Sequence, residues 1–216
     1  MTDLYEGILT TRAIRRFTAE PIGEEDVKAC LRAAMQAPSG GNAQPWQFVV
    51  VTDPELMQAI AAVYLAAYDR WEGAQLASLP PFRSEEDEAG YRRSLRASRY
   101  LAEHLTDAAA LVLFLMPQID LAVSDQGGRI DIGPLYASVY PAVQNFMLAA
   151  RSMGIGTALT TVYWSRQDEL RTLCQIPDRF EVVALVPMGH PRGKFGIAPR
   201  KPPEAVTHWD RYGNRR

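Results

Sequence analysis

The amino-acid sequence predicts an α+β protein, because short strand-like runs alternate with helical segments along one uninterrupted chain. Compact apolar runs at 48–51, 111–115 and 182–186 are rich in β-branched residues and indicate core strands. Apolar residues at helical spacing predict helices over 24–37 and 135–153. The chain has 216 residues, 47% of them hydrophobic, and no linker-like segment, so we expect a single domain, 1–216.

The first half of the chain is expected to form a helix, a strand and a second helix. Pro38 ends the helix of 24–37. The strand of 48–51 is followed by Thr52-Asp53-Pro54, where Asp can cap a helix and Pro can occupy its first turn. The second helix is therefore expected to run from Pro54 through Leu65.

Residues 68–96 have a different character, with scattered aromatic residues, paired prolines and an acidic run. We expect an irregular insertion there, and two interpretations stay open. In the first, the segment is a substrate lid whose Trp71 and Tyr91 close over a bound ring and contact the substrate. In the second, it is a solvated surface excursion.

The second half is expected to contain a long helix and an extended tail. The helix of 135–153 carries few charges before Arg151, which predicts burial on several sides, either in the core or at a dimer interface. Beyond Gly196 the chain is polar and rich in proline, so 196–216 is expected to be an extended C-terminal arm.

Bulk properties exclude several classes of partner. A formal net charge of -2 and a pI near 6.0 give no basic surface for nucleic acid or an anionic membrane. The longest apolar run, 108–116, is too short to span a bilayer, and the N-terminus lacks a signal-peptide pattern. We expect a cytoplasmic protein. The two cysteines and three histidines lack metal-ligand spacing, so no metal site is expected.

The most informative segment is the loop 37–46, which combines two glycines with Asn42 and Gln44 and has no ionisable side chain. Glycines let backbone amides approach a ligand, and each carboxamide offers a donor and an acceptor. This chemistry suits a planar heterocycle better than proton transfer or nucleophilic attack. Taken alone, the loop could also be an ordinary helix exit and turn.

Four motifs together resemble the FMN-dependent nitroreductase family, in order and in spacing. They are Thr11-Arg12-Ala13-Ile14-Arg15-Arg16-Phe17, Pro38-Ser39-Gly40-Gly41-Asn42-Ala43-Gln44-Pro45-Trp46, Pro187-Met188-Gly189-His190-Pro191 and Ala198-Pro199-Arg200-Lys201-Pro202. The similarity extends from Leu4 to the tail at 208–213. It implies a nitroreductase-like fold, with a small central mixed sheet wrapped by helices in an intertwined homodimer that binds FMN at its interface.

The resemblance also implies which residues bind the FMN phosphate. Arg12, Ala13 and Arg15 correspond to the family's N-terminal cofactor-binding segment, and arginine binds phosphate in a bidentate manner. The family usually has a basic residue where Thr11 stands and Ser where Ala13 stands, so one charge and one hydroxyl contact are missing here. Arg200 resembles the C-terminal phosphate-binding arginine.

Other residues are implied to contact the flavin ring. A neighbouring subunit would supply the loop of Pro38, Ser39, Gly40, Gly41 and Asn42, with Gln44 either supporting it or serving only as a structural hydrogen-bonding residue. Leu159, Thr160 and Thr161 stand where family members direct a backbone amide at flavin N5, which stabilises the reduced ring. Gly189 either lets the backbone approach the cofactor closely or only ends a strand.

The implied activity is that of an NAD(P)H-dependent FMN oxidoreductase. In a ping-pong sequence, flavin N5 accepts hydride from NADH or NADPH and electrons then pass to a nitroaromatic, a quinone or a similar conjugated acceptor. The flavin carries the chemistry, so no catalytic side chain is required. Two alternatives stay open: an enzyme of the same fold with little nicotinamide use, of the reductive dehalogenase or flavin-fragmenting type, and a non-enzymatic flavin-binding protein. Asp87 and Tyr91 faintly resemble the deiodinase lid.

Overall fold

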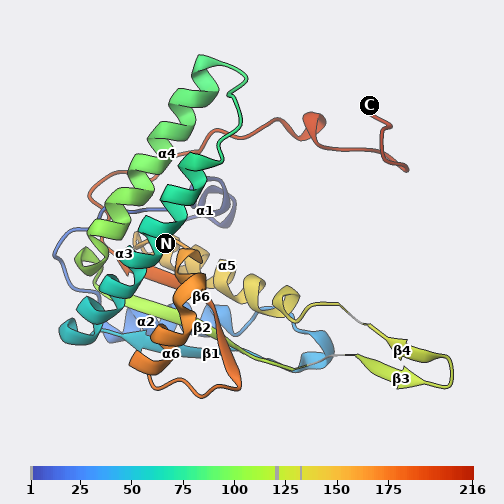
Figure 1. Ribbon diagram of the computed structural model, residues 1–216, viewed down its shortest axis with the longest axis horizontal. Coiled ribbons are helices and arrows are strands. Elements are labelled where there is room, and N and C mark those ends of the chain that lie inside the picture. Colours follow the sequence, from blue (N-terminus) through green and yellow to red (C-terminus); the bar gives the residue numbers. More distant parts are fainter. Residues whose placement is uncertain (1, 120–121, 132) are drawn as a thin grey trace.

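A computed structural model describes residues 2–119, 122–131 and 133–216 (Figure 1). Its helices are α1 (Leu4–Thr10), α2 (Glu24–Ala34), α3 (Pro54–Ala77), α4 (Glu85–Glu103), α5 (Tyr136–Ser152) and α6 (Gln167–Leu173). A central sheet contains β1 (Gln47–Val51), β2 (Ala110–Pro117), β5 (Gly156–Thr157) and β6 (Phe180–Gly189). The strands β3 (Val123–Asp125) and β4 (Gly128–Ile130) form a separate ribbon that extends away from the body (Figure 1).

The central sheet has the strand order β1-β2-β6-β5, and all three neighbouring pairs are antiparallel. After β1, α3 and α4 form an antiparallel pair that returns the chain to the end of the sheet where β1 stopped, so β2 runs in the opposite direction. The α+β class is confirmed. The expected mixed sheet needs a correction: in the described part of the chain, parallel pairing is limited to the single bridge between Ala13 and Thr157.

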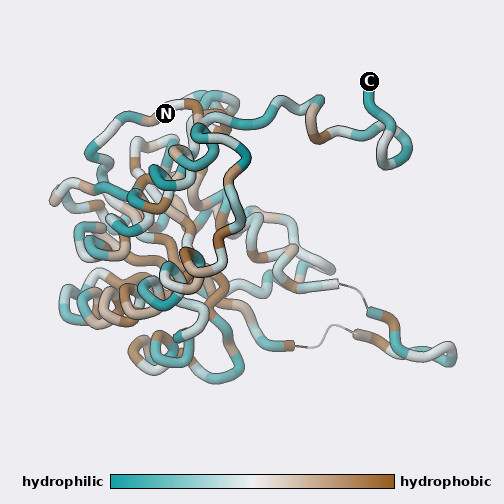
Figure 2. Tube along the Cα trace, turned by 45° about the horizontal axis from the view of Figure 1, so that its top comes forward, coloured by the Kyte–Doolittle hydropathy of each residue, from teal (hydrophilic) through white to brown (hydrophobic). Residues whose placement is uncertain are grey.

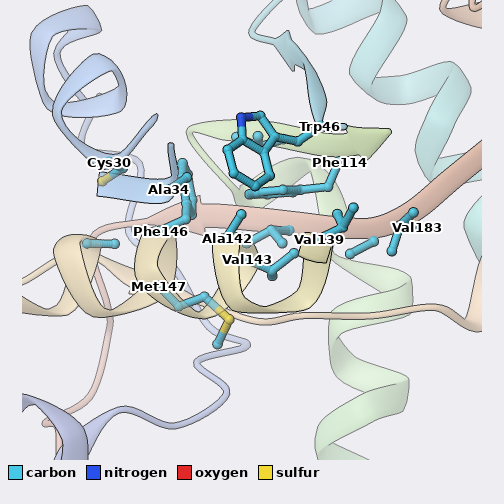
Figure 3. Packing of buried hydrophobic residues seen from close by; sticks show 14 of the residues in the cluster. Cys30, Ala34, Trp46, Phe114, Val139, Ala142, Val143, Phe146, Met147 and Val183 are labelled. Carbon is cyan, nitrogen blue, oxygen red and sulfur yellow. The ribbon is translucent and has the colours of Figure 1, made fainter. Parts of the chain in front are cut away.

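The sheet separates two apolar layers. Successive side chains of β2 point to opposite faces, so Val112 and Phe114 belong to one cluster and Leu111 and Leu113 to the other. Helices α2 and α5 cover the first face, where Phe114, Phe146 and Trp46 belong to one buried cluster (Figure 3). The rings of Phe114 and Phe146 meet edge to face at 5.4 Å. Helices α3 and α6 and the C-terminal end of α4 cover the second face.

The segment 68–96 is helical, and the expectation of an irregular insertion is wrong. α3 continues to Ala77 and α4 begins at Glu85, which leaves a connection of only a few residues. The acidic run that looked like loop forms the first turn of α4, where carboxylates interact favourably with the helix dipole, and Ser84 caps it. Arg99 of α4 pairs with Asp69 and with Glu72 of α3, which ties the two helices together.

The remaining elements lie close to their expected positions. α5 is fully buried at positions such as Val139, Val143 and Phe146, while Tyr140 is 38% exposed, so burial is incomplete on one side. Regular pairing of β5 stops at Thr157, and Thr160 forms only an isolated bridge to Leu185.

Beyond Gly196 the chain has one short 3-10 turn, Pro203–Ala205, and runs away from the body (Figure 1). Figure 2 shows the contrast in hydropathy: apolar segments gather in the centre of the molecule, and the arm is mainly hydrophilic. Within the described residues, no helix combines the length and the apolarity that crossing a membrane requires.

Candidate functional site

The segment that follows α1 lies along the short edge strand β5. The amide of Ile14 donates to the carbonyl of Thr157 at 2.8 Å, and Ala13 pairs with Thr157. Close approach depends on Gly156, because a Cβ there would lie 2.6 Å from Cγ2 of Ile14. The sheet edge therefore fixes the backbone that carries Arg12 and Arg15.

Arg15 lines a hollow of about 260 Å³. Its lining combines aromatic side chains with a stretch of backbone: Arg15, Tyr64, Tyr68, Trp71, Ser98, Leu101, Ala158, Leu159, Thr160, Thr161 and Val162. Burial, with the neighbouring Arg12 charge as a smaller contribution, lowers the pKa of the Arg15 guanidinium. In the described chain, no carboxylate lies within salt-bridge distance of Arg12 or Arg15. A partly buried cation without a carboxylate favours binding of an anion.

Some backbone amides that line this hollow donate hydrogen bonds within the chain, and others have no acceptor among the described residues. Thr160 exchanges two hydrogen bonds with Leu185, at 2.9 and 3.1 Å, and its hydroxyl meets the Tyr64 hydroxyl at 2.9 Å. The amides of Leu159 and Thr161 have no hydrogen-bond acceptor in the described part of the structure. Alternate residues of an extended segment point their amides the same way, so these two donors face away from β6. Of the three predicted residues, Thr160 has a structural role and its neighbours keep free donors.

The loop of 38–44 has a defined, strained backbone. Gly41, Asn42 and Gln44 have φ values of 58°, 56° and 47°, in the left-handed region. The Ser39 hydroxyl accepts from the amide of Gln44 at 3.0 Å, and the Gln44 side chain donates to Oδ1 of Asn42 at 3.3 Å. Gln44 thus supports the loop through structural hydrogen bonds. The amide of Gly40 donates to the hydroxyl of Ser138 on α5 at 3.3 Å.

This loop and the Arg15 hollow lie in different layers of one chain. Pro38, Ser39 and Gly40 line a second hollow, of about 480 Å³, together with Leu135 and Ser138 at the start of α5. The ends of the loop, Ala37 and Trp46, belong to the cluster under α2 and α5. Tyr64, Tyr68 and Leu101 of the Arg15 hollow belong to the cluster under α3 and α4. One chain therefore presents the two parts of the predicted site on opposite faces of the sheet.

The predicted substrate-binding residues are also separated. Trp71 borders the Arg15 hollow, 38% exposed, with its ring 5.3 Å from that of Tyr68. Tyr91 lies on α4 with its ring 5.5 Å from that of Phe82, and is not among the residues that line this hollow. The buried hydroxyl of Tyr91 lacks a hydrogen-bond partner in the described structure.

Gly189 and Arg200 have different surroundings from those of Arg15. A Cβ on Gly189, the last residue of β6, would lie 2.8 Å from the Phe17 ring, so its missing side chain makes room for that ring. A further contact of its backbone with a cofactor stays a prediction. Arg200 is exposed on the arm and donates to the carbonyl of Pro199 at 2.9 Å.

Sequence reasoning missed Tyr64 and Tyr68, although both line the Arg15 hollow. Their spacing of four residues, with Trp71 three residues later, predicts an aromatic ridge on one helix face. The sequence does not predict that this ridge is continuous, because Tyr68 and Trp71 lie beyond Leu65, in the segment expected to be irregular. The described residues also contain no group of His, Cys, Asp and Glu side chains that could hold a metal ion.

Comparison with known proteins matches residues 8–190 to the nitroreductase family. The chain belongs to the nitroreductase family. This is a family of flavin oxidoreductases, and the resemblance found in the four sequence motifs is confirmed.

Individual relatives of this nitroreductase-family chain are distant but cover most of its length. An Archaeoglobus fulgidus protein, named provisionally as an NADH dehydrogenase or NAD(P)H nitroreductase, is 29% identical over 89% of this chain and 87% of its own. An FMN reductase (NADPH) of Bacillus subtilis is 24% identical, with coverages of 98% and 75%. The crystal structure of an oxidized iodotyrosine deiodinase, bound to FMN and 3-iodo-L-tyrosine, superposes with a TM-score of 0.74 at 24% identity, over 97% of this chain and 100% of that one.

Proposed function

We propose that this protein is an FMN-dependent NAD(P)H oxidoreductase that reduces conjugated acceptors such as nitroaromatics and quinones. The observation that carries the proposal is the Arg15 hollow, where a partly buried guanidinium without a carboxylate lies beside free backbone amides. Family membership and the relatives' names support a flavin as the ligand.

The residues of the hollow fit FMN in both charge and shape. Arg12 and Arg15 would bind the phosphate, and Arg200 would join them from the arm. The free amides of Leu159 and Thr161 would donate to the ring, where negative charge develops on reduction. Bound FMN would supply hydride transfer between NADH or NADPH and the acceptor. The side chains of Tyr64 and Tyr68 would exclude water from one wall.

We propose a homodimer as the active unit, because one chain holds the two parts of the site on opposite faces of its sheet. The loop of 38–44 from a second copy would complete the ring site over Arg15. Apolar side chains are available for such contact. On α1, Leu4 and Tyr5 are 71% and 70% exposed, and Tyr140 of α5 is 38% exposed. Light scattering should give a flavin-loaded particle of about twice the 24.0 kDa chain mass. A folded, flavin-loaded monomer would refute this proposal.

The α3–α4 helical pair is proposed as the substrate lid, with Trp71 beside the flavin site and Tyr91 farther along the pair. Replacing either residue with Ala should alter acceptor preference and leave bound FMN in place. The control is Tyr212→Ala, which removes an aromatic side chain that is 93% exposed near the end of the arm. Unchanged acceptor selectivity and KM in both lid variants would make the segment a surface excursion.

The experiment that tests the function is anaerobic mixing with NADH or NADPH while the oxidised-flavin absorbance is recorded. We expect fast bleaching with at least one nucleotide and recovery when a quinone or nitroaromatic is added. Slow bleaching with both nucleotides, alongside full reduction by dithionite, would reject nicotinamide as the donor. Slow bleaching would fit both a flavin-storage protein and a flavin enzyme with little nicotinamide use.

A reductive dehalogenase is the second candidate, because Asp87 and Tyr91 lie one turn apart on α4 and the Tyr91 hydroxyl has no partner in the described structure. Against it, Asp87 is already paired with Arg83 at 3.0 Å. Release of iodide from an iodophenol by the dithionite-reduced protein, without reduction of nitroaromatics, would favour this candidate.

A further inference from the structure

Arg151 is a buried arginine at the end of α5 that the proposed chemistry does not use. It is 8% exposed, and its guanidinium faces the N-terminal segment on one side. Nε donates to the Thr10 hydroxyl at 2.9 Å, one terminal nitrogen donates to the Thr2 hydroxyl at 3.1 Å, and the other lies 3.6 Å from a carboxylate oxygen of Glu6. The guanidinium therefore makes two hydrogen bonds and one ion pair, all with the N-terminal segment.

The same guanidinium also contacts the start of the C-terminal arm. Its central carbon lies 4.2 Å from the centre of the Phe195 ring, a cation–π contact. Thr10 and Phe195 are far apart in sequence and meet on this one side chain. Arg12 follows Thr10 by two residues and Arg200 follows Phe195 by five, so the two segments that carry phosphate-binding candidates start from a common point.

α1 has few other means of attachment to the body. Gly7 is its only buried residue, and its apolar side chains Leu4, Tyr5, Ile8 and Leu9 are all exposed. A seven-residue helix is too short to be stable alone. Thr11 closes the helix by donating its amide and its hydroxyl to the carbonyl of Gly7, and the contacts of Arg151 hold this end of α1 against α5, two residues before Arg12.

We propose that Arg151 is a positioning residue for the flavin phosphate, because it fixes the starts of the two segments that carry Arg12 and Arg200. The inference rests on the proposed FMN site. Arg151 would touch neither the phosphate nor the ring. Its loss should weaken recognition of the phosphate and leave recognition of the ring, which depends on Leu159 and Thr161, nearly unchanged.

The test compares FMN with riboflavin, which has the same ring without the phosphate, by fluorescence titration of the flavin-free protein. Arg151→Met should raise the Kd for FMN about tenfold and change the Kd for riboflavin less than twofold. Arg151→Lys keeps the charge but loses the planar fork, so it should show the same selective loss. Equal changes for both ligands, no change for either, or full recovery of FMN affinity in Arg151→Lys would each overturn the proposal.

Two further variants separate this role from general stability and from the proposed function. Arg171→Met removes another largely buried arginine, which forms an ion pair with Asp168 and donates to the carbonyl of Asp178. Neither contact involves a residue proposed to bind the phosphate. It should lower thermal stability and leave the FMN to riboflavin ratio unchanged. Arg15→Met must itself separate FMN from riboflavin. If it does not, the phosphate assignment fails; if it does and Arg151→Met does not, only the positioning role fails.

Discussion

The loop of 38–44 and the Arg15 hollow differ in how each satisfies its polar groups. In the loop, Ser39, Asn42 and Gln44 bond to one another, and Gly40 bonds to α5, so the loop holds its shape with its own contacts. In the hollow, Arg15 has no carboxylate partner and two amides lack acceptors within the described structure. The first region supplies a preformed shape, and the second leaves charge and donors available for a ligand.

The largest expected effect concerns the anchor of the loop. Trp46 is 4% exposed in the cluster under α2 and α5, whereas Trp71 at the hollow is 38% exposed. Trp46→Ala should lower the free energy of unfolding by about 3–5 kcal/mol through lost burial and a cavity. Trp71→Ala should cost about 1 kcal/mol. Urea unfolding followed by circular dichroism measures both, and equal losses would contradict the contrast between an anchored loop and an open hollow.

A ligand effect without a stability effect is expected at Arg15. Arg15→Met should weaken FMN binding by about 1.5–3 kcal/mol, the scale of a lost charge-assisted hydrogen bond. The flavin-free protein should keep or gain stability, because the substitution removes a desolvated charge that no carboxylate of the described residues compensates. Flavin titration and thermal melts of the flavin-free protein are the measurements. A strongly destabilised flavin-free variant would show that Arg15 already has a structural partner.

The contrast between the loop and the hollow also explains how much of the site the sequence predicts. The sequence predicts the loop because its glycine and carboxamide residues are visible there. The sequence did not show that Asn42 and Gln44 take the left-handed conformation. Hydrogen bonds within a loop depend on the three-dimensional path of its backbone, and amino-acid composition does not determine this path.

The hollow was only partly predictable. The family resemblance predicts Arg15 and the stretch at 159–161. The sequence does not predict that Tyr64, Tyr68 and Trp71 share one helix, because α3 runs twelve residues beyond Leu65, to Ala77. The mixed composition of 68–96 predicts an irregular segment, although its acidic run suits the N-terminus of a helix. Which amides of 159–161 have acceptors depends on the pairing of Thr160 with Leu185. This is a long-range contact, and the periodicity of the sequence does not show it.

Alkaline pH should affect the layer beneath the hollow. Tyr163 is fully buried and donates to the carbonyl of Val182 at 2.8 Å, and burial raises its pKa well above the ordinary value of 10.0. The unfolded chain loses this proton near pH 10 while the folded chain keeps it, so the contribution of Tyr163 to stability is complete below pH 10 and falls above it. The slope for one such tyrosine approaches about 1.4 kcal/mol per pH unit.

Unfolding free energies measured between pH 9 and 11 test this expectation. Tyr163→Phe should make the alkaline slope less steep, since other groups with raised pKa remain, and should cost about 1 kcal/mol at neutral pH through the lost hydrogen bond. Tyr5→Phe is the matched control, because Tyr5 is 70% exposed and should leave the slope unchanged. If both variants gave the wild-type slope, the buried tyrosine would not be the group responsible.

The smallest expected effect tests whether the loop holds its strained shape in the free chain. Gln44→Ala and Gln44→Gly both remove the carboxamide that donates to Asn42, but only glycine adopts a φ of 47° without a steric cost. Gln44→Gly should therefore be more stable than Gln44→Ala by about 1 kcal/mol in urea unfolding. Equal stabilities would mean that residue 44 leaves the left-handed region in solution, and the loop would then acquire its shape only when a second copy and the flavin pack against it.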